Sequence, residues 1–439
     1  MEIIHKYLSA PLSAQFEVVE SCNHRCLHCY NLDSDISNRP TISVPDNTVL
    51  ACAQKLIDSG IFAVVITGGE PLVKKSLTKK VISLFRDNNV KVSLNTNLTL
   101  IDEEFIVFLK KEKIGILTSC PSALPTSFER LVGVNNYERF ESNIKRALEA
   151  GLGLTVNMVV TKDNREDVRI TAQKMKELGV SSFAATPMSL NMEYPRLDLL
   201  LSTQEVRSVI DDLLWAEKEL GLRVDVLEAL PKCLFPETTL SENHSFLKRK
   251  CQAGRTTMAV SCNGDVRPCT HNPKSYGNIL KEDLHGIWAR MSDWRSYQYV
   301  PDECKECLWI HRCNGGCRTN AKAFSGEWDA RDTWSTGPLR TFPPKGHGKP
   351  IEFNENTIFK VNDELRFREE YDHIYVVYNI KGNDYVMVND VFYDFIIDMG
   401  SLDTINYHDL YQRYNTSAED KGFNDSVTYL INKGILKVV

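Results

Sequence analysis

Short apolar runs alternate with amphipathic segments along the first half of the chain. Apolar runs bounded by turn residues indicate buried strands, and apolar residues at helical spacing indicate helices packed on a sheet. On this basis we predict strands over residues 17–22, 61–71, 90–97, 115–120, 154–161 and 181–187. Helices are predicted over residues 44–59, 79–88, 102–112, 139–151 and 165–178.

Repeated strand–helix units predict an α/β fold, because parallel strands joined by helices form a sheet with right-handed crossovers. Six such units suit a partial (β/α)6 TIM-like barrel. Active sites in such sheets lie at the carboxyl ends of the strands. The cysteines after the first strand, the Gly68-Gly69 turn, residues 95–97 and Ser119 all fall at predicted strand ends, so we expect them to share one site.

The pattern changes twice farther along the chain. Residues 231–339 are rich in cysteine and glycine, and they are followed by Pro343, Pro344, Gly346, Gly348 and Pro350, which predict a linker. Residues 351–439 read as short strands and then helices, typical of a small winged-helix-like α+β module. We therefore predict three domains, over residues 1–230, 231–342 and 351–439.

Charge and composition narrow the function. The net charge is −6, and residues 351–439 hold 16 acidic and 8 basic residues, so that region carries −8 and the remainder about +2. A nucleic-acid partner is not expected, because phosphate binding needs a basic face. No apolar run approaches the ~20 residues of a membrane span, and the first residues do not read as a signal peptide. We expect a cytoplasmic protein whose 13 cysteines serve metal or redox chemistry.

The clearest chemical motif is a group of three cysteines, at positions 22, 26 and 29, followed by Tyr30. Thiolates at such short spacing hold iron–sulfur clusters. Three ligands leave one iron of a cubane open for a substrate or cosubstrate. The alternative is a structural zinc site with His24 or His28 as the fourth ligand.

The spacing CxxxCxxC after the first strand resembles that of the radical S-adenosylmethionine (SAM) superfamily. The segment Thr67-Gly-Gly-Glu-Pro71 resembles the glycine-rich motif that follows the second strand in this family. The resemblance implies that Cys22, Cys26 and Cys29 hold a [4Fe–4S] cluster. It also implies that Gly68, Gly69, Glu70 and Pro71 hold the methionine part of SAM.

Weaker matches extend the predicted SAM site to the next two strand ends. By the same resemblance, Asn95, Thr96 and Asn97 lie near the SAM ribose, Ser119 matches a strand-end serine, and Gly133 a downstream glycine. The acidic residue that often follows the serine is absent. Cys120 takes a place nearby, either as a hydrogen-atom donor to a substrate radical or as an ordinary buried residue, as Cys52 is expected to be.

A second cysteine block begins at residue 251. It reads C-x12-G-x4-C and then C-x2-C-x5-C-x3-C, and it resembles the SPASM domain, which carries auxiliary [4Fe–4S] clusters; a zinc ribbon is the alternative. The resemblance implies two ligand sets: Cys251, Cys269 and Cys317 for the first cluster, and Cys304, Cys307 and Cys313 for the second.

Both auxiliary sets lack a fourth ligand in the sequence. The family's last cysteine, expected 17–20 residues after Cys317, is missing. Asp329, Asp332 or a ligand from elsewhere could substitute, or an iron could stay open, so one or two clusters are expected. Cys262 is a candidate for the first set, and the motif gives no role to Cys233.

The acidic third region resembles PqqD-like leader-recognition domains, which implies a precursor-peptide partner bound by strand addition. An oligomerisation domain or a winged helix that binds no DNA is the alternative. The full resemblance implies a peptide maturase in which a 5′-deoxyadenosyl radical takes a hydrogen atom from the peptide. A C–C or C–S crosslink is the predicted product, with a flavodoxin or ferredoxin as electron donor.

Other reactions remain open at this stage: epimerisation with Cys120 as donor, residue excision, decarboxylation, or oxidation of a folded enzyme as in sulfatase maturation. The alternative from another class is a non-catalytic iron–sulfur protein that binds peptides or relays electrons.

Overall fold

We describe a computed structural model of the chain, which covers residues 8–31, 44–242, 244–341, 351 and 353–439. The chain divides into two compact units. One comprises residues 10–343, and the other comprises residues 344–439 with the N-terminal end of the chain. The predicted linker residues from Pro343 to Pro350 lie outside the described residues. The predicted division into three domains stays a prediction.

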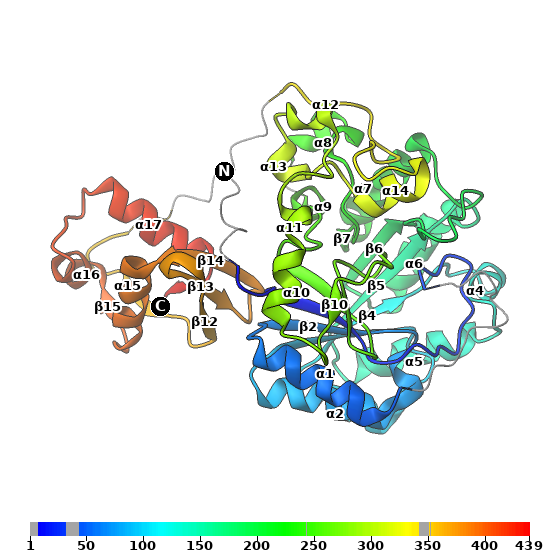
Figure 1. The fold of residues 1–439 in the computed structure, drawn as a ribbon, viewed down its shortest axis with the longest axis horizontal. Helices are drawn as coiled ribbons and strands as arrows, with labels where there is room; N and C mark the ends of the chain where they lie inside the picture. The colour runs from blue at the N-terminus through cyan, green and yellow to red at the C-terminus, as the bar shows by residue number, and fades with distance from the viewer. Residues whose placement is uncertain (1–7, 32–43, 243, 342–350, 352) are drawn as a thin grey trace. The chain divides into compact units, whose positions relative to one another are not determined.

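The larger unit is built on a ten-stranded sheet whose first seven strands follow one another in sequence order and run parallel (Figure 1). This arrangement confirms the predicted α/β partial barrel. The strands are β1 (Ser13–Glu17), β2 (Ala63–Thr67), β3 (Lys91–Thr96), β4 (Gly115–Ser119), β5 (Leu154–Val160), β6 (Ser182–Pro187) and β7 (Arg223–Asp225).

Helices alternate with these strands and bury one apolar face each. In α5 the buried residues Phe140, Ile144 and Ala147 recur at helical spacing. The helices are α1 (Asp46–Asp58), α2 (Lys75–Asp87), α3 (Glu103–Lys111), α4 (Pro125–Val132), α5 (Tyr137–Glu149), α6 (Val168–Glu177) and α7 (Thr203–Leu220).

Four of these elements differ from the sequence predictions: β1 is displaced, and α4, β7 and α7 were not predicted. The first strand ends at Glu17, where the predicted strand begins, because Val18 and Val19 are buried in the loop that follows rather than in the sheet. Helix α7 was not predicted, although Ser202 and Glu205 form a capping box that marks its start.

The cysteine-rich part continues the same sheet. Strand β8 (Thr257–Val260) pairs parallel with β1, and β9 (Asp265–Arg267) and β10 (Gly277–Asn278) extend the edge in antiparallel fashion. Two short helices precede these strands, and five follow them: α8 (Glu237–Leu240) and α9 (Ser245–Lys248), then α10 (Leu284–Arg290), α11 (Ser292–Arg295), α12 (Asp302–Lys305), α13 (Ile310–Cys313) and α14 (Arg318–Ser325). One hydrophobic core runs through both parts and includes Phe16, Trp288 and Trp334. The cysteine-rich part is therefore packed on the barrel.

The C-terminal unit has its own core, centred on Phe359, Leu410 and Leu430. Strands β12 (Leu365–Glu369), β13 (Ile374–Asn379) and β14 (Asp384–Asn389) form one antiparallel sheet. Strands β11 (Ile358–Val361), β15 (Ile405–Asn406) and β16 (Leu436–Val438) form another. Its helices are α15 (Asp390–Gly400), α16 (Tyr407–Arg413) and α17 (Lys421–Asn432). Ser9 belongs to this unit, because its N–H and hydroxyl donate to Glu370 over 2.6 and 2.8 Å.

Candidate functional site

The loop with the first three cysteines leaves β1 and rests on the end of α4. The N–H of Arg25 donates to the carbonyl of Val132 over 2.8 Å, and that of Leu27 to Leu131 over 2.9 Å. Gly133 follows with φ +73°, and a Cβ there would lie 3.0 Å from Arg25. The glycine therefore lets the helix end approach the loop. The three thiols of the loop, those of Cys22, Cys26 and Cys29, are half-buried.

The glycine turn after β2 is fitted against the same loop. The N–H of Gly69 donates to the carbonyl of Val19 over 2.7 Å. A Cβ on Gly68 would lie 2.3 Å from that carbonyl oxygen, and one on Gly69 would lie 2.2 Å from the carbonyl oxygen of Ser21. Backbone contact this close is open only to glycine. The two motifs that the sequence singled out are thus joined in space, as predicted for one site.

Glu70 is buried and holds three segments together. Its Oε1 accepts hydrogen bonds from the Leu72 N–H (2.9 Å) and the Thr96 hydroxyl (2.6 Å), and its Oε2 accepts from the Asn97 N–H (2.6 Å). Burial raises the pKa of Glu70 to about 7, against the lowering effect of these bonds. Its predicted contact with SAM stays a prediction. In this structure the carboxyl group fixes the turn to the end of β3.

The turn after β3 is also tied to the cysteine loop. Asn97 donates to the side chain of Asn23 over 2.8 Å, and Asn23 donates to Thr99 over 2.9 Å. Leu98, between them, is buried and has φ +64°, a conformation that costs a leucine about 1–3 kcal/mol. A strained residue held in place by its neighbours is common at functional sites.

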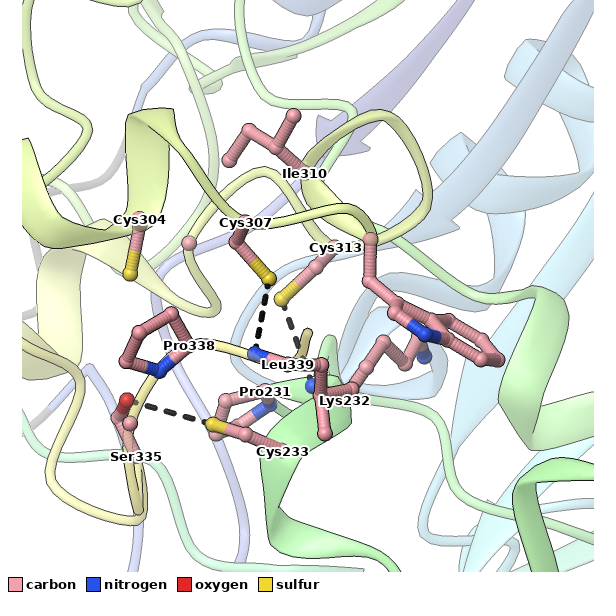
Figure 2. Close-up of a pocket in the computed structure, with 13 residues that line it drawn as sticks. Pro231, Lys232, Cys233, Cys304, Cys307, Ile310, Cys313, Ser335, Pro338 and Leu339 are labelled. Carbon is pink, nitrogen blue, oxygen red and sulfur yellow. Dashed lines mark hydrogen bonds between the residues drawn. The ribbon is translucent and has the colours of Figure 1, made fainter. Parts of the chain in front are cut away.

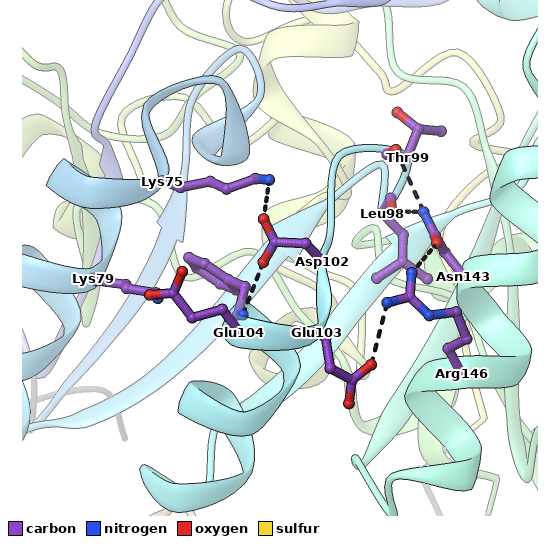
Figure 3. Close-up of polar contacts among 10 residues, drawn as sticks. Lys75, Lys79, Leu98, Thr99, Asp102, Glu103, Glu104, Asn143 and Arg146 are labelled. Carbon is purple, nitrogen blue, oxygen red and sulfur yellow. Dashed lines mark hydrogen bonds and ion pairs between the residues drawn. The ribbon is translucent and has the colours of Figure 1, made fainter.

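Contacts from the helices fix this turn from its other side (Figure 3). The side chain of Asn143 donates to the carbonyl of Leu98 over 2.9 Å. Lys75 pairs with Asp102, which caps α3, and Arg146 pairs with Glu103 over 3.2 Å. These contacts join α2, α3 and α5 beside the turn that follows β3.

The remaining predicted SAM residues lie where the strands end. Asn95 is half-buried on β3, and Ser119 is exposed at the end of β4. Tyr30 is half-buried, its ring centroid lies 4.8 Å from that of His271, and its carbonyl accepts a hydrogen bond from Asn191 over 2.5 Å. The assignment of these residues to SAM stays a prediction.

Cys120 is fully buried directly after β4. Its thiol donates to the carbonyl of Ser122 over 3.3 Å, and burial raises its pKa to about 12. Its two proposed roles, hydrogen-atom donor and core residue, both stay predictions. Cys52 is also buried on the inner face of α1, where it was expected.

A buried ion pair that the sequence did not reveal connects the barrel to the cysteine-rich part. Glu17, the last residue of β1, pairs with Arg267 of β9, and both side chains are shielded from solvent. Burial raises the pKa of Glu17, and the Arg267 charge opposes that shift. The Glu17 side of the pair ends the strand that leads into the cysteine loop.

Cys269 and Cys317 of the first predicted auxiliary set both lie within electrostatic reach of Cys251, and their role as cluster ligands stays a prediction. Burial raises the pKa of Cys269 to about 12 and that of Cys317 well above its usual value, and the charge of Cys251 adds to both shifts. The negative charge of Glu228 raises the pKa of all three thiols, and its Oε1 lies 3.9 Å from Nε2 of His271. Buried thiols lose their protons most readily to a bound metal. Glu228 had no motif that would have revealed it.

Three candidates for a fourth ligand have other surroundings. Asp332 is buried and accepts hydrogen bonds from the backbone N–H groups of Cys317 (2.7 Å) and Trp334 (3.0 Å), so it positions Cys317. Asp329 is exposed. Cys262 is buried beside α1, where its thiol donates to Glu20 over 3.7 Å.

The second auxiliary set lines a pocket of about 310 Å³, its open rim included (Figure 2). Cys304, Cys307 and Cys313 extend from the segment around α12 and α13. A fourth thiol, Cys233, enters the pocket from the turn after β7. The sequence motif gave no role to this residue, because it lies far upstream of the others.

The donors suit iron–sulfur clusters, which are held by cysteine thiolates. One set of three lies in a single loop, a second set of three is half-buried, and the third lines a pocket. In the part of the chain that the structure describes, no three His, Cys, Asp or Glu side chains are arranged to hold a single metal ion. No described helix is both long and apolar enough to span a membrane.

Comparison with known families agrees with this arrangement. Residues 16–175 match the radical SAM superfamily, so the chain contains a radical SAM domain, a class of domain that binds SAM and a [4Fe–4S] cluster. Residues 251–308 match the SPASM iron–sulfur cluster-binding domain, which binds auxiliary clusters. The chain thus contains a radical SAM domain followed by a SPASM domain.

Individual relatives are distant. The chain is 27% identical over 310 residues to the antilisterial bacteriocin subtilosin biosynthesis protein AlbA of Bacillus subtilis, a match that covers 67% of this chain and 65% of AlbA. It is 21% identical to the Fe-coproporphyrin III synthase of Methanosarcina barkeri, covering 74% of this chain and 86% of that protein. The crystal structure of Streptococcus suis SuiB has the same fold, with a TM-score of 0.61, 21% identity and coverage of 75% and 78%.

Proposed function

We propose that the protein is a radical SAM enzyme that matures a ribosomally made precursor peptide, forming a C–C or C–S crosslink. One observation carries the proposal: the three-cysteine loop and the Gly68-Gly69 turn are fitted together, backbone to backbone, in a chain that also has two further groups of cysteines. When bound, the first cluster and SAM supply a 5′-deoxyadenosyl radical that takes a hydrogen atom from the substrate.

The chain's own residues would position these partners. Cys22, Cys26 and Cys29 would hold the cluster, and the strand ends from Gly68 to Ser119 would hold SAM. The hydrogen-bond network of Glu70 and Asn97 keeps those strand ends in fixed positions. A site fixed before the substrate arrives pays less reorganisation at the moment of reaction.

Two features favour a crosslink over epimerisation. Crosslinking removes two hydrogen atoms from the peptide, one as an atom and the other as a proton and an electron, so it needs an electron acceptor. The auxiliary clusters that the other cysteine sets would hold could accept that electron. Epimerisation returns a hydrogen atom instead and would need an accessible donor, whereas the thiol of Cys120 is buried and bonded to Ser122.

The C-terminal unit would recruit the peptide. It has a groove of about 1040 Å³, open to solvent, with apolar walls that include Phe392, Phe395 and Phe423 and acidic residues such as Asp394 and Asp420. Aromatic pockets beside negative charge suit an amphipathic segment with basic residues. The likeness to PqqD-like domains and strand addition as the binding mode are part of this proposal.

Names of relatives support a peptide substrate. AlbA is named for the biosynthesis of a bacteriocin, and SuiB has been solved with the precursor peptide SuiA bound. A flavodoxin or ferredoxin would supply the reducing electron. A cytoplasmic location fits, because a reducing compartment keeps cysteines free to bind iron.

The test is anaerobic turnover of the reconstituted enzyme with SAM and a reductant, with 5′-deoxyadenosine measured by chromatography and peptides by mass spectrometry. We expect a candidate precursor peptide to stimulate 5′-deoxyadenosine formation and to lose about two mass units. The Cys22/Cys26/Cys29→Ala variant should form none.

Coproporphyrin is tested as the competing substrate, since two relatives are named for tetrapyrrole synthesis, Fe-coproporphyrin III synthase and AdoMet-dependent heme synthase. Turnover of coproporphyrin and not of peptide would overturn the proposal. A modified peptide with unchanged mass would indicate epimerisation.

A further inference from the structure

We propose that Cys233 is the fourth ligand of the auxiliary cluster held by Cys304, Cys307 and Cys313. The proposal rests on the SPASM domain holding a cluster and not on the identity of the substrate. Cys233 lies outside the segment that matches the SPASM domain, which covers residues 251–308.

The position of Cys233 in the pocket suits a fourth ligand. Cys233 lies on a short 3-10 helix (Lys232–Leu234) after β7, and it lines the same pocket as the three other thiols. Figure 2 shows Cys304, Cys307 and Cys313 extending into this space from one side and Cys233 from the opposite side. A cubane needs four ligands distributed around it, and three from one side leave the opposite iron open.

Hydrogen-bonding groups face the cysteine sulfur atoms of this pocket. The N–H of Lys232 donates to the sulfur of Cys313 over 3.4 Å, and that of Leu339 donates to the sulfur of Cys307 over 3.2 Å. The sulfur of Cys233 lies 3.4 Å from the Ser335 hydroxyl. Hydrogen bonds to ligand sulfurs stabilise thiolates and set the potential of a cluster. Such donors would have no comparable use around three unrelated thiols.

The backbone of Cys233 is fixed by hydrogen bonds. The residue before it is bonded to Cys313, and its own carbonyl accepts a hydrogen bond from Thr336 over 2.5 Å. The Lys232 ammonium is buried and donates to the carbonyl of Arg249 over 2.7 Å. A buried cation next to the pocket would offset the negative charge that four thiolates bring.

The place of the missing last cysteine of the SPASM pattern also points to Cys233. Ser335 lies 18 residues after Cys317, inside the interval where the last cysteine of the SPASM pattern was expected. Ser335 is the residue that contacts Cys233. A thiol from another segment therefore enters the space that a cysteine at position 335 would reach. Asp332, the other nearby candidate, uses both carboxylate oxygens on backbone N–H groups.

The test isolates the auxiliary clusters in the Cys22/Cys26/Cys29→Ala variant and needs no peptide. In that background we compare Cys233→Ala with Cys52→Ala, which removes a buried thiol far from the pocket. After anaerobic reconstitution, iron and sulfide are counted, chelator resistance is followed, and the reduced protein is examined by electron paramagnetic resonance (EPR).

We expect Cys233→Ala to lose about four irons per chain, or to keep them with a shifted EPR signal and at least tenfold faster loss to a chelator. The double variant Cys233→Ala/Ser335→Cys should recover iron content and chelator resistance. If Cys233→Ala matches Cys52→Ala in iron, spectrum and chelator resistance, Cys233 is not a ligand.

A second measurement covers the case in which Cys233→Ala fails to fold. The unsubstituted chain is alkylated with iodoacetamide before and after reconstitution, and labelled cysteines are identified by mass spectrometry. Protection of Cys233 together with Cys304, Cys307 and Cys313 on reconstitution supports the proposal. Labelling of Cys233 at the same rate in both samples overturns it. Neither result depends on the proposed peptide substrate.

Discussion

The cysteine loop of the radical SAM domain and the cysteine pocket of the SPASM domain offer the same thiolate chemistry but are assembled differently. In the loop, all three cysteines lie within eight consecutive residues, from Cys22 to Cys29. In the pocket, three cysteines come from residues 304–313 and Cys233 comes from the short 3-10 helix after β7. The first site can be read from spacing alone, whereas the second is complete only after the chain has folded.

The two sites also differ in what holds them. The loop is fixed by backbone contacts with a glycine turn, so its geometry depends on the absence of two side chains. The pocket depends on N–H groups that point at sulfur atoms, so its geometry depends on hydrogen bonds across distant segments. Close backbone packing tolerates almost no added volume, whereas hydrogen-bonded ligands tolerate an exchange of position. This contrast can be tested at three places.

The largest effect is expected at the glycine turn. Gly69→Ala would place a Cβ 2.2 Å from the carbonyl oxygen of Ser21, so the turn and the cysteine loop must separate. We expect 5′-deoxyadenosine formation to fall by a factor of a hundred or more, on the order of 3 kcal/mol. The matched control is Gly115→Ala, which meets no atom within 4 Å and should keep near-normal activity. Equal activity of the two variants would show that the close fit is not needed.

The contrast explains how much of the molecule the sequence could predict. The parallel sheet and the cysteine loop follow from local patterns, since strands such as 63–67 have continuous apolar runs and the ligands of the loop are neighbours in sequence. The end of β1 was misplaced because buried Val18 and Val19 look like strand residues but pack in the loop. Cys233, Glu228 and Arg267 act through contacts with residues far away in sequence, and no spacing rule reports such contacts.

An intermediate effect is expected where the two regions join. Arg267→Met would leave Glu17 buried without its partner, and a broken buried pair costs about 3–5 kcal/mol. We expect a lower unfolding midpoint in denaturant and lower iron content in both regions, because β1 leads into the cysteine loop and β9 belongs to the SPASM part. Glu17→Gln/Arg267→Met removes both charges and should recover part of the loss. If only the SPASM clusters are affected, the regions are less coupled than the pair implies.

The smallest effect is expected in the pH dependence of folding stability, through the buried carboxyl group of Glu70. Burial raises the pKa of this carboxyl from 4.5 to about 7, so the folded chain keeps its proton where the unfolded chain has lost it. Stability therefore falls as pH rises from 4.5 through 7, and between pH 5.5 and 8 the loss is about 2 kcal/mol. Glu70→Gln cannot ionise. It loses the bond from the Asn97 N–H at every pH, but it should lose less stability than wild type as pH rises.

The measurement is denaturant unfolding of both proteins, free of cluster, at pH 5.5 and 8, with Glu138→Gln, an exposed position, as the control. We expect the gap between wild type and Glu70→Gln to narrow with pH and the gap for Glu138→Gln to stay constant. A constant gap for Glu70→Gln would mean that the carboxyl is ionised throughout this range. Its three hydrogen bonds would then hold a buried anion, and the turn would be better prepared to accept a donor group from SAM than its burial implies.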